Sequence, residues 1–177
     1  PPRNGVVFLC ACGTRVSDEL VTQHVLSCPR VTGYTRVHRH DSVVLAARRS
    51  LRDSGVITAP CPAEYMVGSY KRPDFLVLFE DGVVLCVDVT VVSAGSATYR
   101  EGASSIDGYA VAEAEFAKTA KHGPAAAAAG HTFVPFGIEA LGRPGPGALS
   151  FVDAVLAYAG VDAFKACGKT YAAPGQR

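Results

Sequence analysis

The pattern of hydrophobic positions is clearest over residues 71–92, where two runs rich in β-branched and aromatic residues flank the tripeptide Glu-Asp-Gly. This pattern predicts a β-hairpin with glycine at the turn position that requires a positive φ. A three-residue loop with a glycine bulge would pair Phe79 with Val83 and place Asp74 opposite Asp88 on one face. A two-residue loop would put the two carboxylates on opposite faces, so the register of the hairpin decides whether they meet.

Helical spacing of apolar residues predicts three helices beyond residue 40, over residues 42–53, 109–122 and 148–164. Asp41 and Ser42 are expected to cap the first helix, and the dipeptide Gly-Pro is expected to end the second. Residues 131–136 are predicted to form a buried strand. The side chains expected to face inward are Tyr109, Ala112, Phe116 and Ala120 in the second helix, and Leu149, Val152, Leu156 and Ala159 in the third. The order helix, β-hairpin, helix, strand, helix predicts an α/β sandwich around a small mixed sheet.

Four potential metal ligands lie near the N-terminus in the pattern C-x-C-x11-H-x3-C: Cys10, Cys12, His24 and Cys28. Residues 17–28 are predicted to form a helix capped by Ser17, which places the histidine and the last cysteine one turn apart on the same side. A cysteine pair on a turn and a His/Cys pair on a helix can surround Zn²⁺ with no open position, so we expect a structural zinc site. In the alternative interpretation, the first two cysteines are strand residues and the histidine lies on the surface.

Asp88 interrupts an otherwise apolar run. A buried, unpaired carboxylate is costly unless its pKa shifts or it meets a cation. Two facing carboxylates favour a divalent cation, and oxygen ligands of this kind suit Mg²⁺ or Mn²⁺. A group that positions water would have to come from elsewhere, and Lys118 and Lys121 can share a face of the second predicted helix with Glu115. Alternatively, Asp74 only begins a strand, Asp88 bonds to backbone, and the lysines are surface residues.

The chain has 177 residues, 49% of them hydrophobic, and a net charge of +1, which suits one folded domain with a core. Residues 1–72 hold ten Lys and Arg against five Asp and Glu, a balance of +5, whereas residues 73–177 hold seven against eleven, a balance of −4. No apolar run is long enough to cross a membrane, so we expect a soluble piece of a longer protein. A solvated helix face would explain the basic part, but its arginines also suit phosphate contacts. The expected nucleic-acid-binding residues are Arg30, Arg36, Arg39, Arg48, Arg49, Arg52, Lys71 and Arg72.

In this order, the motifs resemble the restriction-like endonuclease domain of site-specific non-long-terminal-repeat retrotransposons, a branch of the PD-(D/E)XK nuclease superfamily. The resemblance covers most of the chain, and the composition and C-x-C spacing are similar to elements of trypanosomatid type. It implies a CCHC-type zinc knuckle over residues 1–33 and an endonuclease domain with a PD-(D/E)XK core over residues 34–177. The matching motifs are the Cys/His pattern, Arg39-His40-Asp41 opening a helix, Lys71-Arg72-Pro73-Asp74, Asp88-Val89-Thr90 and Lys118-x-x-Lys121.

The resemblance implies a divalent-metal-dependent endodeoxyribonuclease linked to a reverse transcriptase. Asp74 and Asp88 would hold the catalytic Mg²⁺ or Mn²⁺, and Lys118 would act as base or orient the water, with Lys121 close by. The zinc knuckle would help to lay the protein on double-stranded target DNA. The enzyme would nick a genomic site in the nucleus and leave a 3′-hydroxyl that primes reverse transcription of the element RNA.

Two functions from other classes fit the same motifs. In a zinc-stabilised nucleic-acid-binding module without catalysis, Asp74 and Asp88 would be structural, and a cleavage assay of an Asp88 variant would separate this module from a nuclease. A zinc-bearing protein-interaction domain would lack the steep loss of DNA affinity with salt that phosphate contacts produce.

Overall fold

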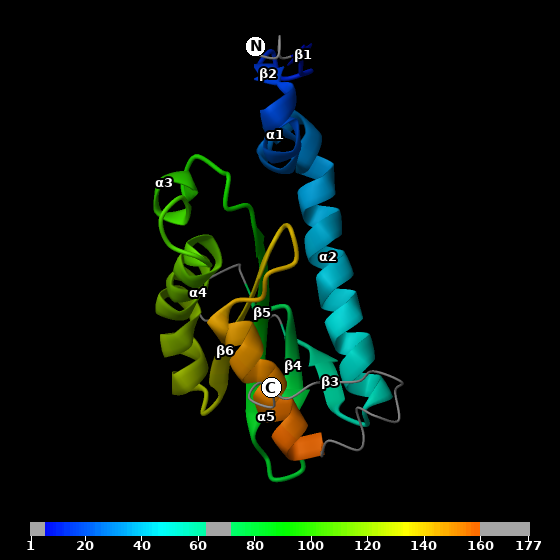
Figure 1. The fold of residues 1–177 in the computed structure, drawn as a ribbon. Coiled ribbons are helices and arrows are strands. Elements are labelled where there is room, and N and C mark those ends of the chain that lie inside the picture. Colours follow the sequence, from blue (N-terminus) through cyan, green and yellow to red (C-terminus); the bar gives the residue numbers. More distant parts are fainter. Residues whose placement is uncertain (1–5, 63–71, 160–177) are drawn as a thin grey trace, which may run out of the picture.

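The computed structural model describes residues 6–62 and 72–159 of the chain. Over these ranges the protein is an α/β fold with a small N-terminal hairpin and a four-stranded mixed sheet (Figure 1). The elements, in chain order, are β1 (Val7–Leu9), β2 (Arg15–Ser17), the 3-10 turn η1 (Asp18–Leu20), α1 (Val21–Ser27), α2 (Pro29–Asp53), β3 (Ile57–Pro60), β4 (Phe75–Leu78), β5 (Val84–Val92), α3 (Arg100–Ala103), α4 (Tyr109–Ala128), β6 (Thr132–Glu139) and α5 (Pro146–Ala159).

The four-stranded sheet has the strand order β3-β4-β5-β6, in which β5 and β6 are parallel and the other neighbours are antiparallel. The register of β4 and β5 is the predicted one, because Phe75 pairs with Val87 and the Phe79 N–H donates to the Val83 carbonyl at 3.0 Å. Gly82 has φ 85° in the turn. The three-residue loop with a glycine bulge is therefore confirmed.

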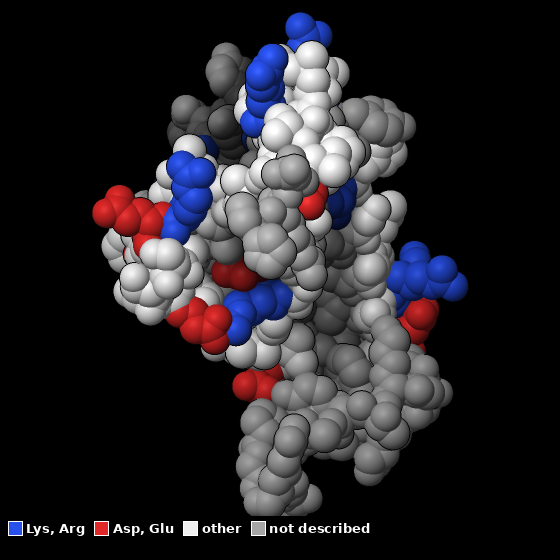
Figure 2. Space-filling view, turned by 45° about the horizontal axis from the view of Figure 1, so that its top comes forward, with Lys and Arg blue, Asp and Glu red and all other residues white. Residues whose placement is uncertain are grey.

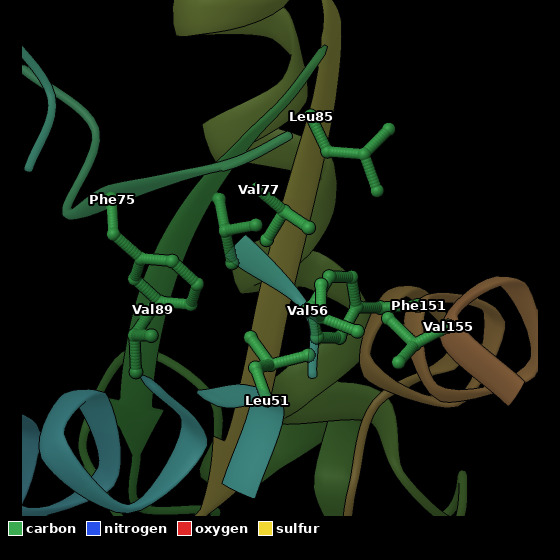
Figure 3. Close-up of a cluster of buried hydrophobic side chains, with 9 residues drawn as sticks. Leu51, Val56, Phe75, Val77, Leu85, Val89, Phe151 and Val155 are labelled. Atoms are coloured by element: carbon green, nitrogen blue, oxygen red, sulfur yellow. The ribbon is translucent and has the colours of Figure 1, made fainter. Parts of the chain in front are cut away.

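Helices cover both faces of the sheet. On one face, α2 and α5 enclose the larger core, in which Leu51 and Phe151 belong to one cluster with Phe75 and Val89 of the hairpin (Figure 3). On the other face, Ala126 of α4 packs with Cys61, Leu76 and Cys86. Successive residues of β5 therefore face different helices: Val87 and Val89 face α2 and α5, whereas Asp88 faces the side of α4.

The predicted start of the first long helix at Asp41 and Ser42 is wrong. α2 begins at Pro29, has Cys28 as its N-cap and runs for 25 residues to Asp53. Proline is favoured in the first turn of a helix because its missing N–H would have no partner there. Asp41 consequently lies in the middle of α2, and Arg39-His40-Asp41 does not open a helix.

The predicted end of the second helix at Gly123 is also wrong, since α4 continues through Pro124 to Ala128. An interior proline costs about 3 kcal/mol, but alanines of high helix propensity follow it, and Ala126 is buried against the sheet.

The inward face of α4 differs from the prediction as well. Phe116 is 72% exposed and Ala120 is exposed, whereas the buried residues are Ala110, Val111, Ala114, Glu115, His122 and Ala126. Apolar residues surround this helix on most sides, so their spacing could not select one face. In α5, Leu149 is exposed, while Leu156 is buried and Ala159 packs on the core as expected.

Two predictions lie outside the described residues: Lys71 and the end of the third predicted helix beyond position 159. β3 was not predicted, and it adds a short edge strand that ends in Pro60. No helix in the described ranges combines the length and hydrophobicity needed to cross a bilayer.

Candidate active site and metal centre

The four N-terminal ligands converge on one point. Cys10 and Cys12 lie on the turn between β1 and β2, and His24 and Cys28 lie at the end of α1. The Cys10 and Cys28 Sγ atoms are 3.6 Å apart, Cys12 Sγ is 3.4 Å from His24 Nε2, and all four ligand atoms lie within 4.8 Å of one another. Tetrahedral zinc with bonds of about 2.0–2.3 Å places its ligand atoms about 3.5–3.8 Å apart. The cluster could therefore hold a metal ion such as zinc.

Local backbone structure shapes this cluster. The Cys10 N–H donates to the Thr14 carbonyl at 2.9 Å, and Gly13 closes the turn with φ 86°. The Thr14 side chain lies 3.2 Å from Cys12 Sγ, and its hydrogen bond is the main cause that lowers the pKa of the Cys12 thiol to about 6. Cys12 is therefore largely a thiolate at neutral pH, which is the form that binds zinc.

We expect Cys28→Ser to lose bound zinc, because a serine hydroxyl is a poor substitute for a thiolate. Wild-type protein purified with zinc is expected to contain one zinc per chain, measured by elemental analysis. Cys61→Ala is the matched control, since burial raises the pKa of the Cys61 thiol to about 11 and keeps it protonated away from the cluster. Equal zinc contents in both variants would contradict the site.

The hairpin brings two carboxylates together where β4 begins. Asp74 immediately precedes β4, whose first residue Phe75 pairs with Val87, and the Asp74 N–H also donates to the Val87 carbonyl at 2.9 Å. Asp74 therefore lies beside this part of β5, and its charge acts on Asp88. One carboxylate oxygen of Asp74, Oδ2, accepts the Val89 N–H at 2.7 Å. Asp74 is half-buried, and Asp88 is 4% exposed.

Lys118 of α4 reaches this pair. Its Nζ lies 2.6 Å from Asp88 Oδ2, whereas Lys121 is exposed. Burial raises the pKa of Asp88, the ammonium of Lys118 opposes that shift, and the charge of Asp74 reinforces it. The structure thus brings Asp74, Asp88 and Lys118 together.

His40 adds a cation that the sequence did not place in the site. Its Nε2 lies 3.2 Å from Asp74 Oδ2 and its Nδ1 lies 3.1 Å from Asp41 Oδ1. The hydrogen bond to Asp74, helped by the one to Asp41, raises the pKa of His40 to about 9. The residue is therefore a positively charged imidazolium at neutral pH. Its position in the middle of α2 could be recognised only once the whole helix was known.

Glu115 fixes the helix that carries Lys118. Its buried carboxylate accepts backbone N–H groups from Gly137 at 2.8 Å, Gly147 at 2.8 Å and Ala148 at 3.1 Å. Two of these donors lie in the first turn of α5, where helix N–H groups have no partner within the helix. A Cβ atom at position 145 would lie 2.4 Å from Glu115 Oε1. The glycine therefore leaves the space that the Glu115 carboxylate occupies.

His122 is a second buried polar residue of α4 that sequence analysis missed. It is 2% exposed and lies against Phe133 with 5.7 Å between ring centroids. Burial lowers its pKa, and the nearby charge of Asp88 only partly compensates. The residue is a neutral imidazole beside the carboxylates. Its spacing of four residues from Lys118, which places both on one side of a helix, was the signal that could have identified it.

The predicted phosphate-binding arginines do not form one stripe. Neighbours such as Arg48 and Arg49 point about 100° apart on a helix. Arg39 donates to the Leu26 carbonyl at 3.3 Å, Arg49 lies 3.9 Å from Asp53, and Arg72 donates to the Cys61 carbonyl at 3.3 Å. Figure 2 shows the described Lys and Arg side chains scattered over the face in view, several beside an acidic residue. Arg30, Arg36 and Arg52 are exposed on α2.

The fold and the N-terminal cluster define an α/β protein with a Cys₃His group that could bind zinc. Comparison of the sequence with models of known families and with curated proteins found no match.

Proposed function

We propose that the chain is a divalent-metal-dependent DNA endonuclease of the PD-(D/E)XK type. The observation that carries the proposal is the meeting of Asp74, Asp88 and Lys118 at one edge of the hairpin, with 2.6 Å between Lys118 Nζ and Asp88 Oδ2. The order helix, hairpin, helix, strand, helix that the resemblance implies recurs in α2, β4 with β5, α4, β6 and α5, which supports the same class.

The donor set fits a hard divalent cation. Asp74 and Asp88 offer carboxylate oxygens, and the buried Asp88 needs a positive partner. Asp74 and Asp88 would hold Mg²⁺ or Mn²⁺, which would supply charge neutralisation at the phosphate and activate water. Lys118 would orient the attacking water or stabilise the negative charge on the phosphate, and the leaving group would be the 3′ oxygen. The product would be a nick with a free 3′-hydroxyl.

The wider role proposed here follows the resemblance. The nick would be made in double-stranded target DNA in the nucleus, and its 3′-hydroxyl would prime reverse transcription of a retrotransposon RNA. Binding of the target would involve the zinc knuckle and the exposed arginines of α2.

The direct test is conversion of supercoiled duplex DNA to nicked circles by purified, zinc-loaded chain in Mg²⁺ or Mn²⁺. We expect nicking that stops when the added divalent cation is omitted. DNA binding without any cation-dependent nicking would contradict the proposal.

The same assay distinguishes the two lysines of α4. We expect Lys118→Ala to lower the nicking rate about 100-fold, since removal of one charge-stabilising donor costs about 10²–10³ in rate. Lys121→Ala is expected to lower it no more than about threefold, because the exposed ammonium has no partner at the carboxylates among the described ion pairs. A larger loss in Lys121→Ala than in Lys118→Ala would reverse the assignment.

A nucleic-acid-binding module without catalysis is the second candidate. The specific observation in its favour is the contact between Lys118 and Asp88, which neutralises the buried carboxylate without any cation. In that protein the pair would hold α4 against the hairpin, and the purified chain would bind DNA without any cation-dependent nicking.

A further inference from the structure

The Asp74 carboxylate is held asymmetrically. Its Oδ2 accepts two hydrogen bonds, from the Val89 N–H at 2.7 Å and from His40 Nε2 at 3.2 Å. Oδ1 receives no hydrogen bond from any described residue. Two donors on one oxygen fix both the rotation of the side chain and which oxygen remains available to another ligand.

His40 is oriented in turn by its other nitrogen. Nδ1 lies 3.1 Å from Asp41 Oδ1, so both ring nitrogens face carboxylates. An imidazole in this setting can satisfy both only when both nitrogens carry a proton and donate. Asp41 follows His40 on the same helix, so α2 positions both residues. They form a series of hydrogen bonds that runs from Asp41 through His40 to Asp74.

We propose that His40 is a positioning residue for the catalytic cation: it fixes Oδ2 of Asp74 so that Oδ1 alone binds the metal. This inference rests on the proposed function, because it assumes that Asp74 is a metal ligand. It assigns a role to a residue of α2, on the opposite face of the sheet from Lys118. Carboxylates that bind metals are commonly oriented by such outer hydrogen bonds, and loss of one typically lowers metal affinity 10–100-fold.

A purely structural role for His40 is disfavoured by its surroundings. Its side chain is 32% exposed and that of Asp74 is 20% exposed, and neither belongs to the two apolar cores. Ion pairs with this degree of exposure contribute little to folding stability. The contact therefore matters for where the Asp74 oxygens point more than for whether the chain folds.

The test is Mn²⁺ binding to the zinc-loaded chain, followed by the electron paramagnetic resonance signal of free Mn²⁺, for wild type, His40→Ala, His40→Gln, His38→Ala and Asp88→Ala. We expect His40→Ala to weaken Mn²⁺ binding about tenfold or more. His40→Gln retains an N–H donor near the position of Nε2, so we expect it to bind within about threefold of wild type. His38→Ala removes an exposed histidine of the same helix and is expected to bind normally. Nicking by His40→Ala is expected to recover as Mn²⁺ is raised.

Wild-type affinity in His40→Ala, together with weak binding in Asp88→Ala, would overturn the role of His40 and leave the metal site intact. Identical Mn²⁺ titrations of wild type and Asp88→Ala would contradict the carboxylate metal site, and the proposed nuclease with it. Circular dichroism verifies the fold of each variant. If His40→Ala does not fold, His40→Asn replaces it, because its shorter side chain cannot reach Asp74 Oδ2.

Discussion

We expect Asp88→Ala to lose cation-dependent nicking by about 10³-fold or more while it still binds DNA. Asp88 is the buried member of the proposed metal pair, and removal of its carboxylate leaves Asp74 as a single protein ligand. It also removes the anion that holds Lys118 at 2.6 Å, so the ammonium loses its position beside the reacting phosphate. One substitution therefore removes a metal ligand and the contact that positions Lys118.

The fold is expected to survive this change. A buried carboxylate carries a desolvation cost that alanine does not, and Lys118, whose side chain is 33% exposed, can turn toward water. Thermal unfolding checks that the Asp88→Ala variant is folded, and a DNA-binding titration checks that it still binds DNA. Glu80→Ala is the control, because Glu80 is exposed on the turn of the same hairpin. Nicking by Asp88→Ala at the wild-type rate would contradict the role of Asp88 as a catalytic metal ligand, and with it the proposed nuclease site.

We expect Glu115→Ala to cause a large loss of stability, about 3 kcal/mol or more, because it strips the acceptor from three backbone N–H groups that are wholly or partly buried. For a chain of this length, that corresponds to a fall in melting temperature of about 6–12 °C. The first turn of α5 loses its cap, and α4 loses its anchor to β6. Glu115→Gln is expected to be intermediate, since it retains one acceptor oxygen but turns an NH₂ group toward a backbone donor.

The matched control for Glu115 is Glu113→Ala, two residues earlier on the exposed side of α4. It is expected to change stability by no more than about 0.5 kcal/mol. Differential scanning calorimetry of the three variants makes the comparison. A melting temperature of Glu115→Ala close to that of Glu113→Ala would show that the N–H groups find other partners.

Local chemistry explains what could be predicted from the sequence. A glycine at the third loop position sets the turn type, and the turn type sets the register that pairs Phe75 with Val87 and so brings Asp74 near Asp88. The spacing of Cys10, Cys12, His24 and Cys28 is likewise a local pattern, and the ligand atoms do meet. These features depend on a few neighbouring residues rather than on the rest of the fold.

The missed features depend on distant partners. Glu115 faces inward because backbone N–H groups more than twenty residues away donate hydrogen bonds to its carboxylate. The spacing of apolar residues in α4 gives no information about these distant donors. His40 acquires its role from Asp74, thirty-four positions along the chain. β3 is short and ends in a proline, which suits an edge strand but gives a weak sequence signal.

The continuous helix α2 sets a fixed distance between the Cys/His cluster and the carboxylate site. Cys28 caps the start of this helix and His40 contacts Asp74 twelve residues later, a rise of about 18 Å along the axis, or about five base pairs of B-form DNA (Figure 1). A knuckle that grips DNA would therefore stand at a set distance from the carboxylates. Lengthening the helix by one turn would move the zinc knuckle about 5.4 Å farther from the point of cleavage without altering either the Cys/His cluster or the carboxylates. In such a nuclease, helix length would help determine which phosphate is cut.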